Sequence, residues 1–367
     1  MRIVYRIALL AVCIVLLISS VFVSSAFAQE QKLKTQEITL TPNHYKVKMP
    51  MTDGQLWRGQ EVSYLEFELP IRDGVPAILD IDAEDNVWFV MGGGGFAGIT
   101  FPPLNYVGKI NLSGKFTLYA LPTQGSLPNG IKVGKNGLVY VTEYLGNQIA
   151  VLNPKTKKVT EYPLLTRDAR PTALDLDSHG NLWFNENLGY KIARLSPVGV
   201  IKEFSIPTPN SRPTGMVIDK NDLVWFAELN GNKIGAYSPN GVFTEYAVPT
   251  PQGKPTAMAK DEEGGIWFSE RGGNKIGRLF QGSIQEFALP NTNSSPFFLV
   301  NGPEQAIWFA QLTGNRIGRL DKKSGTFAEL EVPTKDAAPA GLGFDKKNNL
   351  WFTMQMENKV GVILLEQ

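Results

Sequence analysis

Four glutamates recur in this sequence at nearly regular intervals of 42 or 43 residues: Glu143, Glu186, Glu228 and Glu270. Carboxylate oxygens are the ligands that Mg²⁺ and Ca²⁺ prefer in proteins. If the fold gathers these side chains at one place, they predict a site for one of these two ions. The same carboxylates would equally form a polar cup for a cationic or hydrogen-bonding ligand.

A second interpretation of the glutamates needs no ligand. Lysine follows three of them at a distance of five residues, in the pairs Glu186 and Lys191, Glu228 and Lys233, and Glu270 and Lys275. If each pair flanks a hairpin loop, the two residues face each other and form a cross-strand ion pair, worth at most about 1 kcal/mol when exposed. Glu143 faces Gln148 instead. It is therefore the best candidate for a functional acid, and the catalytic residues are otherwise unknown.

Proton-transfer chemistry usually uses histidine, because its pKa lies near neutrality. The chain has only two histidines. His179 falls in the turn-like stretch "DSHGN" and is expected to be solvated, and His44 lies near the N-terminus. The single cysteine, Cys13, lies in the first 28 residues. The rest of the chain therefore has no thiol nucleophile, disulfide or cysteine metal site.

The glutamates belong to a repeat of about 42 residues. An aromatic or apolar pair marks each of seven copies, and the first members of the pairs are 52, 43, 42, 42, 41 and 43 residues apart. The pairs are Trp88-Phe89, Tyr140-Val141, Trp183-Phe184, Trp225-Phe226, Trp267-Phe268, Trp308-Phe309 and Trp351-Phe352.

Each copy contains the pattern of four short strands, which we call A to D. Strand A opens at a proline, strand B carries the aromatic pair, strand C reads "NKIGRL" or similar, and strand D reads "GVIKEFSIP" or similar. Alternating apolar residues and turn-rich punctuation indicate antiparallel strands. Seven such units predict an all-β, seven-bladed propeller, in which each sheet buries its two faces against its neighbours.

The two ends of the repeat region predict how the ring closes. The last copy supplies strands A, B and C and then ends at Gln367, whereas a strand D without its own copy stands at 62–70 as "VSYLEFELP". We expect this N-terminal strand to complete the C-terminal blade. The propeller then spans residues 61–367. Residues 29–60 form an extension that fits no repeat and is expected to supply an extra strand or a tether.

Residues 1–28 have the features of a cleavable signal peptide. Arg2 and Arg6 precede a long apolar run, and "AFA" ends at Ala28. Cleavage there predicts a secreted or periplasmic protein with no membrane span. The remaining chain has 34 basic and 35 acidic residues, so no nucleic-acid partner is expected, and we expect a monomer.

The motifs "P-T-G-[ML]", "G-x-[LI]-W-F-x-E", "N-K-I-G-R-L" and "E-[FY]-x-[ILV]-P-T" together resemble the virginiamycin B lyase family over about 61–367. The resemblance implies a seven-bladed propeller that opens cyclic depsipeptide antibiotics by elimination at the ester. It further implies Mg²⁺ as cofactor, a histidine base where one strand A opens, and a metal-binding acid near the end of a strand B.

The sequence departs from the family at the place of that base. The residues after the strand-A prolines are Ala77, Asn129, Thr172, Thr214, Thr256, Phe297 and Ala340. Because none is histidine, we expect a ligand- or protein-binding propeller, with its small-molecule or protein partner at one mouth of the ring. The alternative is a Mg²⁺- or Ca²⁺-dependent carbon–oxygen lyase or lactone-opening hydrolase.

The expected binding rim lies where strands A begin and strands B end. Asn129, Thr172, Thr214 and Thr256 share this rim with the four glutamates, which are the predicted metal ligands. The glycine-rich stretch 91–106 lengthens the loop between strands B and C in the first copy. Its Phe96 and Phe101 are expected to cover a ligand at the same rim.

Overall fold

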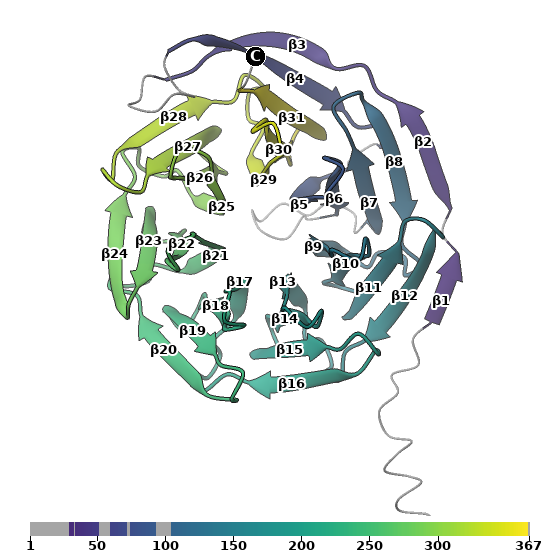
Figure 1. The fold of residues 1–367 in the computed structure, drawn as a ribbon, viewed down its shortest axis with the longest axis vertical. Helices are drawn as coiled ribbons and strands as arrows, with labels where there is room; N and C mark the ends of the chain where they lie inside the picture. Colours follow the sequence, from purple (N-terminus) through teal and green to yellow (C-terminus); the bar gives the residue numbers. More distant parts are fainter. Residues whose placement is uncertain (1–28, 33, 51–58, 72–73, 93–103, 366–367) are drawn as a thin grey trace, which may run out of the picture.

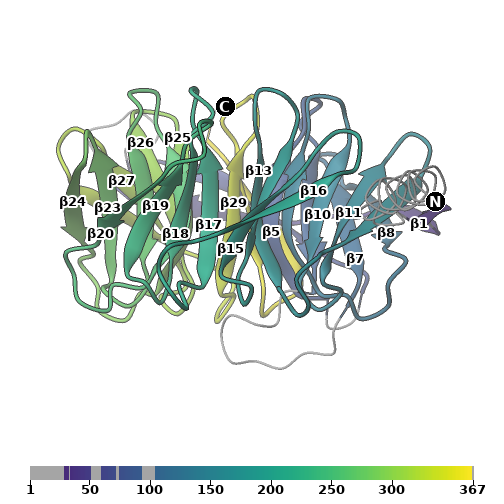
Figure 2. The ribbon, with the colours of Figure 1, turned by 90° about the horizontal axis from the view of Figure 1, so that it is seen from below.

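The computed structural model describes residues 29–32, 34–50, 59–71, 74–92 and 104–365. In this part of the chain every regular element is a β-strand. Seven sheets stand around a common axis (Figure 1), which confirms the predicted seven-bladed propeller. Seen from the side, the strands of adjacent blades stand next to one another around the ring (Figure 2). The predicted signal peptide, Phe96 and Phe101 lie outside the described residues.

Every blade places strand A innermost, followed by B, C and D. Blade 1 contains β5 (Pro76–Ile81), β6 (Val87–Met91), β7 (Tyr106–Ile110) and β8 (Lys115–Ala120). Blade 2 contains β9 (Pro128–Val133), β10 (Val139–Glu143), β11 (Gln148–Asn153) and β12 (Lys158–Pro163). Blade 3 contains β13 (Pro171–Leu176), β14 (Leu182–Glu186), β15 (Lys191–Leu195) and β16 (Ile201–Ser205). Blade 4 contains β17 (Pro213–Ile218), β18 (Val224–Glu228), β19 (Lys233–Tyr237) and β20 (Phe243–Ala247).

The remaining three blades follow the same plan, but the last is built from both ends of the chain. Blade 5 contains β21 (Pro255–Lys260), β22 (Ile266–Glu270), β23 (Lys275–Phe280) and β24 (Ser283–Ala288). Blade 6 contains β25 (Pro296–Gly302), β26 (Ala306–Gln311), β27 (Arg316–Asp321) and β28 (Phe327–Glu331). Blade 7 contains β29 (Pro339–Phe344), β30 (Leu350–Met354), β31 (Lys359–Leu364) and, from the N-terminal part, β4 (Glu61–Glu68).

Strand β4 closes the ring, as the sequence predicts. It pairs antiparallel with β31, from Lys359 opposite Glu68 to Leu364 opposite Ser63. The first and last parts of the propeller are thus held in one sheet by backbone hydrogen bonds.

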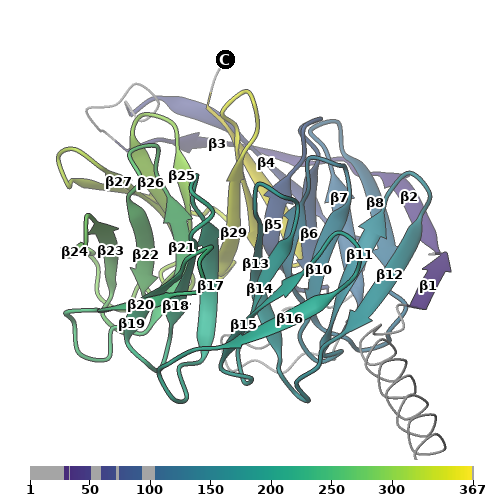
Figure 3. The same ribbon diagram turned by 60° about the horizontal axis from the view of Figure 1, so that its bottom comes forward.

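The N-terminal extension adds a fifth, outermost strand to each of three adjacent blades (Figure 3). Strand β1 (Gln29–Lys32) pairs with β12, β2 (Thr35–Thr39) with β8, and β3 (Asn43–Lys48) with β4. The extension therefore runs along the edges of blades 2, 1 and 7. Each added strand covers an otherwise open sheet edge.

The aromatic pairs form the core between blades. Trp183 packs with Met216 and Phe226 of blade 4, whereas Phe184 packs with Tyr140 and other residues of blade 2. The pair thus joins one blade to both of its neighbours, and this explains why it recurs in every copy. Trp225 is only partly buried, unlike the other tryptophans of the repeat.

The glycine in "NKIGRL" has a packing role that the sequence pattern does not reveal. In blade 6 the Phe309 ring covers Gly318 so closely that a Cβ atom there would lie 2.1 Å from the ring. The two residues face each other across β26 and β27. A Cβ atom at Gly318 would therefore require the Phe309 ring to move. Blade 3 accommodates Ala193 at this position, opposite a Phe184 that is still buried.

Candidate functional site

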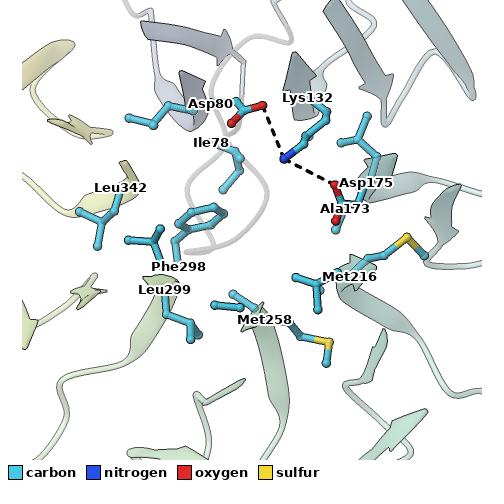
Figure 4. A pocket seen from close by; sticks show the side chains of 18 of the residues that line it. Ile78, Asp80, Lys132, Ala173, Asp175, Met216, Met258, Phe298, Leu299 and Leu342 are labelled. Carbon is cyan, nitrogen blue, oxygen red and sulfur yellow. Dashed lines mark ion pairs between the residues drawn. The ribbon is translucent and has the colours of Figure 1, made fainter. Parts of the chain in front are cut away.

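The seven A strands surround a central cavity of about 410 Å³. This volume lies in the range of small-molecule binding pockets. Much of the wall is apolar, and Figure 4 shows Ile78, Met216, Met258, Phe298, Leu299 and Leu342 around the opening. Phe298 and Ile78 narrow the cavity, because they are large side chains at a position of strand A where the other five blades have glycine or alanine. We call this cavity the central channel.

Four of the described residues that line the channel are charged: Asp80, Lys132, Asp175 and Lys260. The Nζ atom of Lys132 lies 3.8 Å from Oδ2 of Asp80 and 3.5 Å from Oδ1 of Asp175. The Nζ atom of Lys260 lies 3.9 Å from Oδ2 of Asp175. Asp80, Lys132 and Asp175 come from blades 1, 2 and 3, so they form a charged corner on one side of an otherwise mainly apolar ring (Figure 4).

Backbone hydrogen bonds fix the two aspartates of the charged corner. Asp80 Oδ2 accepts from the backbone N–H of Val133 at 2.8 Å, and Asp175 Oδ2 accepts from that of Ile218 at 3.0 Å. Each carboxylate thereby satisfies a donor on the neighbouring blade. Lys260 donates to the carbonyl oxygen of Ile218.

The charged state of the corner follows from its geometry. The two carboxylates raise the pKa of Lys132 above its ordinary value, so this side chain is protonated at neutral pH. Burial raises the pKa of Asp80, and Lys132 opposes that effect. The corner thus places a protonated lysine at ion-pair distance from two aspartates, beside an apolar wall.

Asn129, Thr172, Thr214 and Thr256, the described residues of the predicted rim, line the channel. All four side chains are buried. Two threonine hydroxyls donate to carbonyl oxygens of the next strand A: Thr172 Oγ1 to the oxygen of Thr214 at 3.4 Å, and Thr214 Oγ1 to that of Thr256 at 3.0 Å. Thr256 Oγ1 donates to the carbonyl oxygen of Lys254, just before its own strand, at 2.9 Å. The hydroxyls of Thr172 and Thr214 thus join adjacent A strands between which no backbone ladder is described. The role of the four rim residues in ligand binding stays a prediction.

The predicted metal ligands Glu143, Glu186, Glu228 and Glu270 are fully buried in four separate blades. None of them lines the channel in the described structure. The described residues contain no group of three or more histidine, cysteine, aspartate or glutamate side chains that could hold a metal ion. The four carboxylates therefore do not provide the shared oxygen cage that Mg²⁺ or Ca²⁺ requires.

The prediction that each lysine pairs with the strand-B glutamate opposite it is wrong. Lys191, Lys233 and Lys275 are in the predicted register, but each Nζ donates to a glutamate of strand D at 2.6–2.7 Å. The partners are Glu203, Glu245 and Glu286. A lysine can reach diagonally to strand D, where the carboxylate is more exposed than on strand B.

Glu143 has a different environment, as its sequence suggests. Gln148 Nε2 donates to Glu143 Oε2 at 2.5 Å, whereas Oε1 has no hydrogen-bond partner. Burial raises the pKa of Glu143 to about 7. The residue faces its own hairpin and not the channel, and its proposed role as a functional acid stays a prediction.

Neither histidine lies at the channel. His179 is exposed in the turn between strands A and B of blade 3, with Nδ1 3.2 Å from Ser178 Oγ and 3.4 Å from Asp222 Oδ2. His44 is exposed on β3, at the outer edge of blade 7.

The charged corner is the feature that sequence reasoning missed. Its signal was the fourth residue after each strand-A proline, which reads Asp80, Lys132, Asp175, Val217, Ala259, Val300 and Gly343. Three consecutive blades thus have a charged residue at this position, in strands that are otherwise largely apolar. This pattern indicates a partly polar channel wall. The predicted rim lies at the other end of strand A, where Asn129, Thr172, Thr214 and Thr256 follow the prolines.

Comparisons with known proteins agree with the architecture. The virginiamycin B lyase family model matches residues 54–229, 98–281 and 230–366. Virginiamycin B lyase from Staphylococcus aureus is 30% identical, with a TM-score of 0.76 over 83% of this chain and 99% of that one. A catalytically inactive variant of that enzyme with quinupristin is 31% identical, with the same TM-score and coverage.

A structure described as a streptogramin B lyase is 30% identical, with a TM-score of 0.75 over 82% of this chain and 96% of that one. A comparison with curated protein sequences finds no match. The motifs, the seven blades and the family model agree over nearly the whole propeller. This chain belongs to the virginiamycin B lyase family.

Proposed function

We propose that this protein is an exported, ligand-binding member of the virginiamycin B lyase family, with the central channel as its binding site. The observation that carries the proposal is the channel itself: a cavity of about 410 Å³ with an apolar wall and one charged corner. Binding pockets commonly combine a mainly apolar lining with a few placed polar groups. Export rests on the leader-like residues 1–28.

The same proposal holds that the protein does not carry out the family's elimination reaction. That reaction needs a base at the substrate, and no histidine follows a strand-A proline in this sequence. Lys132 of the charged corner does not replace it, because two aspartates hold this lysine in its protonated form. Incubation with quinupristin followed by mass spectrometry should return the intact antibiotic. Ring-opened product at a catalytic rate would overturn this part of the proposal.

Channel binding has its own test. Ala173 lines the channel between blades 2 and 4 (Figure 4), and Ala173→Phe should fill part of the cavity. Ligands found by a thermal-shift screen of small amphiphiles should lose affinity for this variant. They should keep their affinity for Lys202→Met, a change at an exposed position of β16. If the filled variant binds every ligand as tightly as the unmodified protein does, the channel is not the binding site.

Dependence on Mg²⁺ or Ca²⁺ stays a prediction of the family resemblance. The buried glutamates do not fit such an ion as a group. Melting temperatures with Mg²⁺, Ca²⁺ and EDTA test the prediction directly. A rise with either ion that EDTA reverses would support a metal site.

A further inference from the structure

The charged corner carries an inference about the chemical class of the ligand, which rests on the proposed function. We infer that the central channel selects an uncharged amphiphile: an apolar body with a neutral head group that both donates and accepts hydrogen bonds, such as a primary amide. The head lies at Lys132 and its neighbouring aspartates. The body lies against the apolar wall.

The first step of the argument is the charge balance of the channel. Its four described charged residues are two aspartates and two lysines. A charged head group would therefore enter a partly buried, electrically balanced site without a counterion of its own, and this is unfavourable. A neutral head group meets no such penalty.

The second step is the distance from Lys132 to its partners. Its Nζ lies 3.5 and 3.8 Å from the two carboxylates, whereas the blade-edge lysines lie 2.6–2.7 Å from theirs. The ammonium of Lys132 is thus held by charge without a short hydrogen bond to either carboxylate. Its N–H donors can contact an acceptor atom of a ligand head, and Asp80 or Asp175 can accept an N–H from the same head.

The third step is the shape of the apolar wall. Ile78 and Phe298 project into the channel, and Phe298 lies on the far side from Lys132 (Figure 4). The side chains of Met216 and Met258 point away from the channel, into the core between blades. The other five blades have glycine or alanine at the strand-A position of Ile78 and Phe298, which leaves space for a ligand beside these two side chains. The wall therefore suits an aliphatic chain or small ring.

The experiment compares three matched probes by isothermal titration calorimetry at pH 7: octanamide, octanoate and octylammonium. They share the same chain and differ in head-group charge. We expect octanamide to bind the unmodified protein at least about tenfold more tightly than either ion. Ala173→Phe should weaken all three.

Single charge changes should then alter the preference in opposite directions. Lys132→Met leaves an excess negative charge in the channel and should favour octylammonium. Asp80→Asn leaves an excess positive charge and should favour octanoate, while its amide oxygen can still accept from Val133. The double variant restores the balance and should again prefer octanamide. Lys202→Met, which changes the net charge at the outer edge of blade 3, should change none of these preferences.

The outcomes separate the inference from the proposed function. If octanoate or octylammonium binds the unmodified protein as well as octanamide does, and Ala173→Phe weakens binding, the channel binds ligands but the inferred class is wrong. If no probe binds at millimolar concentration, the inference is also wrong. Asp80→Asn keeps the test valid if Lys132→Met does not fold, because either single change must shift the preference in its stated direction.

Discussion

Lys191 and Glu203 form a 2.7 Å ion pair on the edge of blade 3, and Lys191 thereby leaves Glu186, its cross-strand neighbour, without a hydrogen-bond donor. Both oxygens of the Glu186 carboxyl are buried and without a partner, and the Glu203 carboxylate lies beside them. A proton on Glu186 supplies the missing donor, because a protonated carboxyl can donate to a carboxylate. Glu228 with Glu245 and Glu270 with Glu286 repeat this arrangement.

This arrangement predicts that the propeller loses stability as the pH rises. Burial, together with the neighbouring strand-D carboxylate, raises the pKa of Glu186 and Glu228 to about 8 and that of Glu270 to about 7. In the unfolded chain these groups titrate near pH 4.3. Folding therefore favours their protonated forms, and this contribution is complete below about pH 4 and is lost as the pH rises through 7–8.

Glu186→Gln should remove the contribution of blade 3 to the pH dependence of the free energy of unfolding. The neutral amide keeps the size of the side chain and supplies a permanent donor to Glu203. We expect the variant to be more stable than the unmodified protein at pH 8, by roughly 1–3 kcal/mol, and nearly equal to it at pH 5. Urea unfolding at the two pH values measures the difference. Glu331→Gln, at an exposed position of β28, should be neutral at both, and an equal gain at pH 5 and 8 would contradict the protonation argument.

Blade 6 allows the reverse substitution to be tested, from glutamine to glutamate. Gln311 stands where other blades have the buried glutamate, and its Nε2 donates to Glu329 Oε1 at 2.8 Å. Gln311→Glu should be tolerated at pH 5, where the new carboxyl is protonated. It should cost roughly 1–3 kcal/mol at pH 8, where two carboxylates would face each other. A loss of the same size at both pH values would indicate a packing defect instead.

The repeat explains why the sequence predicts the propeller architecture correctly. Period-two patterns around Trp183, Trp267 and Trp351 depend on burial, which every blade requires, so seven copies predict one architecture. The separate strand D at 62–70 likewise predicts how the ring closes, because the last blade would expose a sheet edge without this strand.

The errors concern side-chain reach, which register does not determine. Lys191 faces Glu186 as predicted, yet its ammonium continues to Glu203, and the sequence alone cannot choose between two glutamates within reach of one flexible lysine. Predicting the charged corner requires knowing that strand A lies innermost in every blade. Asp80, Lys132 and Asp175 are far apart in the chain and come together only around the axis of the propeller.

The motif "E-[FY]-x-[ILV]-P-T" is explained by a contact between blades, and this contact predicts a second stability effect. Thr208, in the connection from blade 3 to blade 4, donates its backbone N–H and its hydroxyl to Glu245 Oε1 at 3.1 and 2.9 Å. Lys233 donates to the same hydroxyl at 2.7 Å. The threonine thus ties the connection to strand D of the following blade.

Thr208→Val should remove this hydroxyl without changing the size of the side chain. We expect a loss of about 1–2 kcal/mol in urea unfolding, because a partly buried lysine and glutamate lose a shared hydrogen-bond partner. Thr208→Ser retains the hydroxyl and should lose less. Thr244→Val, at an exposed position of β20, controls for the change of residue type, and an equal loss there would remove the role of the contact.

The last prediction concerns ring closure. In the N-terminal region, the outer strands β1, β2 and β3 and the ring-closing strand β4 contribute differently to stability. A chain that begins at Gly59 loses β1, β2 and β3 but keeps β4, whose Glu66 meets Lys359 at 3.3 Å and accepts a hydrogen bond from Thr334 of the preceding connection. Because blade 7 still has its four strands, this chain should fold with a lower melting temperature. The buried Val47 and Met49 are its main loss.

A chain that begins at Gly74 also loses β4, and with it the buried Tyr64 and Phe67. Blade 7 then has three strands, and the faces of β31 and its neighbours become exposed. We expect this chain to unfold or aggregate, as measured by circular dichroism and size-exclusion chromatography. Glu66→Ala in the full chain should fall between the two truncations, since it leaves Lys359 without its carboxylate but keeps the strand pairing. If the chain from Gly74 folds as well as the chain from Gly59, β4 does not hold the ring closed.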